Sequence, residues 1–113
     1  MEQRDNVIDR IVEHLENVRQ RPLMFIGELY AEAIHTYLFA FTAGCRICGR
    51  DRPQDHYWKV YETRGWKMNS LGLYKSMRDA GMPEAAVVDE LIVIEIEAWR
   101  QFGAEACQTY VTP

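Results

Sequence analysis

Several signals that would assign this chain to a large protein class are missing or scarce. It has only three cysteines, an odd number, so a disulfide framework is not expected and a reducing compartment fits best. Its longest uncharged run, Ala33 to Cys45, is shorter than the about 20 residues that a helix needs to cross a bilayer. The opening residues, MEQRDNV, are polar and charged, unlike a signal peptide. We therefore expect a cytoplasmic protein with no membrane segment.

Positive charge is scarce as well. Lys and Arg together number 13 against 17 Asp and Glu, which gives a net charge of −4. The only basic clusters are RQR at 19–21 and RDR at 50–52, whereas nucleic-acid binders carry a basic face, so no nucleic-acid partner is expected. A glycine-rich phosphate loop and a nucleophile elbow are also missing. An enzyme is therefore not favoured, and an enzyme without a recognisable motif stays as an alternative.

The chain does have helical periodicity, over a length that fits a single domain, residues 1–113. Apolar residues spaced three and four positions apart predict helices over 5–20 and 29–48. Pro22 ends the first helix, since the residue before a proline is pushed out of the α region, and Gly49 ends the second. The first stripe consists of Ile8, Ile11, Leu15 and Val18, and the second of Ala33, Ile34, Tyr37, Leu38, Phe41 and Cys45.

The second half of the chain predicts three more helices, over about 55–64, 70–80 and 83–103. Within the last of these, IVIEIE alternates like a half-buried strand, so an α+β fold with a strand near 91–97 is the alternative. We prefer the helix, because the alanines, the glutamates and both end signals agree with it. Its carboxylates are interpreted as a solvated face. The expected fold class is all-α, a compact bundle of about five helices.

The clearest candidate for a metal site is the CRICG motif. Cys45 and Cys48 have the spacing at which two thiolates reach one zinc ion, and His56 follows. A closed structural site needs four ligands, and no second pair supplies the rest. We interpret the two cysteines as small apolar groups at a helix end and expect no cofactor. A small zinc-binding domain using Cys45, Cys48 and His56 remains an alternative.

Aromatic residues are concentrated in the segment 55–74, where the helical signals are weakest. The segment contains Tyr57, Trp58, Tyr61, Trp66 and Tyr74 together with Lys59, Arg64 and Lys67. Tyr, Trp and Arg dominate interface hot spots, because they bury a large area and keep a polar group. We predict that at least one of Trp58, Arg64 and Trp66 is exposed and contacts a partner. In the alternative, both tryptophans are ordinary core residues.

The stretch LENVRQRPLMFIGE, residues 15–28, resembles the start of the ATPase domain of the gyrase B subunit and its type II topoisomerase relatives. In that family a helix ends in a pattern like RPGMYIG, and the next helix supplies an acidic base and a magnesium-binding asparagine. Here the next helix has Glu32 but no asparagine, and no D-x-G-x-G loop follows. The resemblance covers about a dozen residues and does not imply ATP binding. We interpret the stretch as a structural corner, with apolar residues that fold back on the core.

A second resemblance extends along more of the chain. The RPLMFIG corner, the RGW middle and the final VVDELIVIEIEAWRQF are similar to small bacterial proteins of uncharacterised or immunity type, which pair an RPxMYIG corner with an apolar helix and an acidic last helix. The resemblance implies a non-enzymatic, immunity- or inhibitor-like protein of bacterial or phage origin that binds a protein partner stoichiometrically. Pairing with a second copy of the chain stays open.

Overall fold

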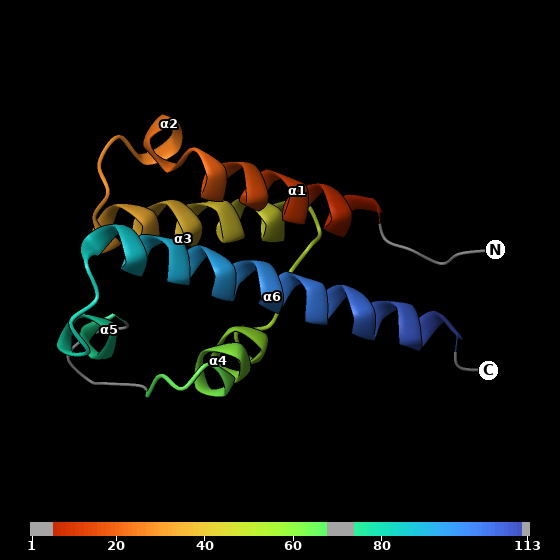
Figure 1. Ribbon diagram of the computed structural model, residues 1–113. Coiled ribbons are helices and arrows are strands. Elements are labelled where there is room, and N and C mark those ends of the chain that lie inside the picture. Colours follow the sequence, from red (N-terminus) through yellow and green to blue (C-terminus); the bar gives the residue numbers. More distant parts are fainter. Residues whose placement is uncertain (1–5, 68–73, 112–113) are drawn as a thin grey trace.

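The fold is built from helices alone wherever the structure describes it. The computed structural model describes residues 6–67 and 74–111, and over these ranges it contains six helices and no strand (Figure 1). They are α1 (Asn6–Gln20), α2 (Pro22–Ile26), α3 (Ala31–Ile47), α4 (Gln54–Thr63), α5 (Lys75–Asp79) and α6 (Glu84–Val111). The all-α prediction is confirmed. The strand alternative near 91–97 is wrong, because those residues lie inside α6.

The last helix is the centre of the bundle. α6 packs against α1, α3, α4 and α5, whereas α2 contacts only α1 and α3. In Figure 1, α3 and α6 run in the same direction along the long axis of the molecule, α1 runs in the opposite direction, and α4 lies on the other side of α6 from α1. A helix in this position is covered on several sides and has no single solvated face.

This central position explains the alternating sequence of α6. Leu91, Ile92, Ile94, Ile96 and Trp99 are all buried, although they do not share one stripe. A helix that is apolar on most of its faces is buried on most of its faces. The β-branched run is therefore buried on several sides of α6, and tertiary packing outweighs its preference for a strand.

Two features of the helices differ from the sequence-based predictions. α6 does not end at Gly103 but continues to Val111, and the corner after Pro22 forms the short extra helix α2, which makes six helices rather than five. The predicted helix over 70–80 is described only as α5, since residues 68–73 lie outside the described residues. None of the helices in the described ranges combines the length and the apolar character that a membrane crossing requires.

Gly103 has a packing role rather than a capping role. A Cβ built on it would lie 2.9 Å from Cγ2 of Ile8, a buried residue of α1. This distance is shorter than the 3.5–4.0 Å at which two carbon atoms attract each other best. Alanine is the better helix former, but the missing side chain of Gly103 allows α1 and α6 to approach each other closely at this position.

The corner between α1 and α3 folds as expected for a structural turn. Phe25 and Ile26 pack against the core, and Gly27 has a φ of 75°, which residues with a Cβ rarely adopt. Leu23 and Met24 point outward instead, and Met24 is 72% exposed. The interpretation of the stretch as a corner is consistent with this packing, although only some of its large apolar residues reach the core.

A candidate binding cavity between α3, α4 and α6

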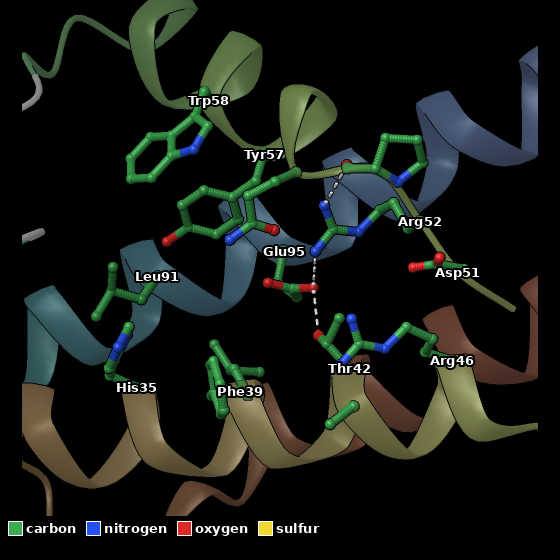
Figure 2. A pocket seen from close by; sticks show the side chains of 14 residues that line it. His35, Phe39, Thr42, Arg46, Asp51, Arg52, Tyr57, Trp58, Leu91 and Glu95 are labelled. Carbon is green, nitrogen blue, oxygen red and sulfur yellow. Dashed lines mark hydrogen bonds and ion pairs between the residues drawn. The ribbon is translucent and has the colours of Figure 1, made fainter.

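A cavity of about 410 Å³ lies where α3, α4 and α6 meet. Figure 2 shows side chains from the three helices and from the α3–α4 linker around it. The lining residues are His35, Leu38, Phe39, Thr42, Ala43 and Arg46 of α3, Asp51, Arg52 and Pro53 of the linker, Gln54, Tyr57 and Trp58 of α4, and Leu91 and Glu95 of α6. Its volume falls in the range of small-ligand pockets, about 300–1,000 Å³.

One side of the cavity is formed by a buried ion pair between Arg52 and Glu95, whose side chains are only 1% and 4% exposed. Arg52 Nη2 donates to Glu95 Oε2 at 2.5 Å, and Nη1 donates to the carbonyl oxygen of Pro53. The guanidinium also lies over the ring of Trp99, 5.2 Å from its centroid. The cation therefore has compensating contacts for part of the hydration it loses on burial.

The two oxygens of the Glu95 carboxylate have different surroundings. Oε2 accepts three hydrogen bonds, from Arg52 Nη2, from Thr42 Oγ1 at 3.2 Å and from Trp99 Nε1 at 3.0 Å. Oε1 accepts none from any described residue. In Figure 2 it is turned away from Arg52 and Thr42, to the side on which Tyr57 and Leu91 lie. A buried carboxylate is thus held rigidly through one oxygen and keeps the other one available.

Tyr57 brings a second polar group, its hydroxyl, to the cavity. The residue is buried, and its hydroxyl makes no hydrogen bond to another described residue. Burial, followed by the negative charge of Glu95, raises the pKa of Tyr57 above its ordinary value. The hydroxyl therefore stays neutral, and it can donate or accept a hydrogen bond inside the cavity.

Aromatic side chains form the walls and the rim. Trp58, half-buried, packs edge-on against Tyr57 and Tyr61, with ring centroids 5.4 and 5.5 Å apart. Phe39 on α3 is 71% exposed, which is unusual for so large an apolar side chain. His35 is also exposed and makes an edge contact with Tyr74. The cavity thus joins a buried polar interior to an apolar rim that faces solvent.

The three predicted partner-binding residues are not all in one place. Trp58 lines the cavity. Arg64 and Trp66 instead meet at Glu90 of α6, which accepts from Arg64 Nε and Nη2 at 2.6 and 2.8 Å and from Trp66 Nε1 at 2.8 Å. Arg64 also reaches Glu97 at 3.3 Å. Arg64 is exposed and Trp66 is half-buried, so the exposure that the prediction requires exists, and partner contact by these residues stays a prediction.

The residues of the zinc alternative are also distributed over different elements. Cys45 and Cys48 line a groove between α1 and α3, together with His14 rather than His56. His56 Nε2 instead shares a hydrogen bond of 2.8 Å with Glu105 Oε1 on α6. Burial raises the pKa of the Cys45 thiol, which disfavours the thiolate that a metal needs. Within the described residues, no three side chains of the histidine, cysteine or carboxylate type are grouped to hold a metal ion.

Sequence reasoning missed the two charged residues at the centre of the cavity. Arg52 belongs to a short basic cluster between two predicted helices, and Glu95 was assigned to a solvated face, but both are buried. A signal was present: Glu95 lies four residues before Trp99 in the most apolar part of the last helix, where a carboxylate on one face is surrounded by core residues.

Comparisons with protein-family models, with curated proteins and with solved structures find no match to this chain.

Proposed function

We propose that this chain is a non-enzymatic protein that binds a protein partner stoichiometrically, in the manner of an immunity or inhibitor protein. The observation that carries the proposal is the cavity between α3, α4 and α6 with its solvent-facing aromatic rim. Hot spots of protein interfaces are pockets of this kind, in which aromatic and arginine side chains surround a desolvated centre.

The outer face of α3 supports the same function. This helix has only two charged residues, Glu32 and Arg46, and it exposes Phe39, which lines the cavity, to 71%. α3 packs against α6, contacts α2 near the corner, and meets His14 of α1 through Tyr37 and Phe41, whereas Phe39 stays exposed. An aromatic ring that is exposed at the edge of a pocket can bury a large area against a partner.

The test is retention of a partner by the immobilised chain from a lysate of its native host, with two matched variants. Phe39→Ser removes the exposed ring at the cavity, and Ile47→Ser removes a side chain that is even more exposed on the same helix but does not line the cavity. Both changes are on the surface, so we expect both variants to unfold within about 0.5 kcal/mol of the wild type.

We expect the wild type and Ile47→Ser to retain one protein in a one-to-one ratio, and Phe39→Ser to lose it. Sedimentation of the purified pair then gives the stoichiometry. Retention of the same proteins by all three chains contradicts the proposal, and so does a retained protein that is chemically converted by this chain, since that would indicate an enzyme. A second copy of this chain as the retained protein would indicate a homodimer instead.

A further inference from the structure

We propose that the cavity between α3, α4 and α6 receives a planar aromatic side chain with a neutral N–H or O–H donor, a tyrosine or tryptophan of the partner, whose donor binds Glu95 Oε1. This inference rests on the proposed function, because it assigns the chemistry of the group that the partner would insert. It follows from three properties of the cavity: its free acceptor, its charge balance and its aromatic walls.

The free acceptor requires a donor on the ligand. Glu95 is buried, and three donors fix its Oε2, so the carboxylate cannot turn without breaking these bonds. Oε1 therefore points in one direction, into the cavity (Figure 2). Hydrogen bonds to an ionised carboxylate are about twice as strong as neutral ones. A ligand that fills the cavity without donating a proton leaves a buried acceptor unpaired and loses that bond.

The charge balance selects a neutral donor over a cation. The negative charge of Glu95 is already compensated by Arg52, and among the described residues the lining adds one further charge of each sign, Arg46 and Asp51. An ammonium group placed at Oε1 would lose its hydration, and the guanidinium bound to the same carboxylate would weaken the attraction that it gains in return. A phenol or an indole supplies the donor without adding a charge. An anion is disfavoured in turn, because it would face the free carboxylate oxygen.

The walls of the cavity select an aromatic ring. Tyr57 and Trp58 form one wall, Leu91 lies beside Glu95, and Phe39 stands at the rim. Offset and edge-to-face ring contacts are more favourable than the area they bury alone would give. The volume of about 410 Å³ leaves room for an aromatic side chain. Tyrosine and tryptophan are also the residues most enriched at interface hot spots, where they pair with hot spots on the partner.

The experiment uses the wild-type chain and small probes that represent the side chains, followed by two-dimensional NMR of the backbone amides. 4-Methylphenol and 3-methylindole carry the donor. Toluene and 1,3-dimethylindole are their matched controls without it, and benzylammonium tests a cation. We expect each donor probe to bind at least about tenfold more tightly than its control and to shift the amide signals of residues 35–46 and 51–58. Benzylammonium should bind no more tightly than toluene.

Equal affinities of 4-methylphenol and toluene would overturn the role of Glu95 Oε1, and tightest binding by benzylammonium would overturn the charge argument. The role of Glu95 Oε1 is tested with probes on the native chain and not with a Glu95→Gln variant. That variant would leave Arg52 without its counter-charge and is expected to lose stability. Tyr57→Phe serves as the folded variant: it retains the ring, and we expect it to keep the preference for the donor probes. Loss of that preference would assign the donor to the tyrosine hydroxyl instead.

The source of the aromatic group is tested separately on the captured partner. Replacing its inserted tyrosine by phenylalanine, or its tryptophan by a residue without the N–H group, should weaken the complex at least about tenfold. If a partner depends on Phe39 but the probes show no donor preference, protein binding stands and this inference fails. If the probes show the preference but no partner depends on Phe39, the proposed function fails and the cavity is a site for a small phenolic or indolic molecule.

Discussion

Replacing Gly103 by alanine is expected to destabilise the chain, although the same change elsewhere in a helix would stabilise it. Alanine exceeds glycine in helix propensity by about 1 kcal/mol. At Gly103, however, the new Cβ would lie 2.9 Å from Cγ2 of Ile8. Ile8 is buried and β-branched in α1, so it has little rotamer freedom to move away. Overpacking of this kind costs about 1–3 kcal/mol.

Gly44 of α3 provides the control, because a Cβ there would meet nothing within 4 Å. Gly44→Ala should raise the free energy of unfolding by about 1 kcal/mol, and Gly103→Ala should change it by between roughly zero and −2 kcal/mol. The difference between the two variants, about 1–3 kcal/mol, isolates the contact with Ile8. Urea denaturation followed by circular dichroism measures both values.

A third variant tests the cause. In an Ile8→Ala background the Cγ2 atom is missing, so Gly103→Ala should become stabilising, even though Ile8→Ala itself costs about 2–5 kcal/mol. The chain can tolerate that loss if its total stability is roughly 6–17 kcal/mol, as its length suggests. If Gly103→Ala stabilises the wild type as much as Gly44→Ala does, then α1 and α6 do not approach here and the packing argument is refuted.

Four further predictions concern the charged residues and the metal content. Arg52→Met should lower the free energy of unfolding by about 3–5 kcal/mol, because it leaves the Glu95 carboxylate buried and unpaired, and adding Glu95→Leu should recover most of that loss. Additive losses of the two single variants in a double-mutant cycle would contradict the pairing. Arg64→Ala should lower the free energy of unfolding by about 1 kcal/mol, because Arg64 is one-third exposed and solvent screens its ion pair; no change would mean that the pair is not formed in solution. The hydrogen bonds from Arg64 lower the pKa of Glu90 below its ordinary value of 4.5. The stability that this carboxylate contributes is therefore present above pH 4.5 and is lost as the pH falls through the lowered pKa. Acid titration of Arg64→Ala should show a smaller loss of stability than the wild type over that range, and equal losses would argue against the assignment. The purified chain should hold less than one equivalent of zinc by elemental analysis, since His56 is bonded to Glu105; one equivalent that disappears when both cysteines of CRICG become serine would instead support a zinc-binding function.

The helices could be predicted from the sequence where a single apolar stripe of the helix is buried against the rest of the bundle. The stripe of Ile8, Ile11, Leu15 and Val18 does so: it is buried as a unit, and α1 ends just before Pro22 as expected. The last helix was harder to interpret, because its burial on several sides removes the periodicity that distinguishes a helix from a strand. Gly103 was interpreted as a helix end, since the sequence does not show that Ile8 would occupy the space of its missing side chain.

The site was less predictable than the fold, because its polar centre is formed by residues far apart in the sequence. Trp58, which the sequence analysis predicts as a candidate for partner contact, lines the cavity, and its contact with a partner stays a prediction. Arg52 and Glu95 were not, since 43 positions separate them and each resembles an ordinary surface charge when considered alone. Only the packing of the α3–α4 linker against α6 shows that they neutralise each other away from solvent.

The central position of α6 also determines when the chain can fold during synthesis. The ribosome completes α1, α3, α4 and α5 before it starts the helix against which all four pack. At 5–20 residues per second, the 28 residues of α6 take about 1–6 s to be added. Throughout that interval the apolar faces of the earlier helices lack their main partner. The nascent chain is therefore a good substrate for chaperones that hold apolar segments, and stalled translation inside α6 should yield aggregating fragments rather than partly folded domains.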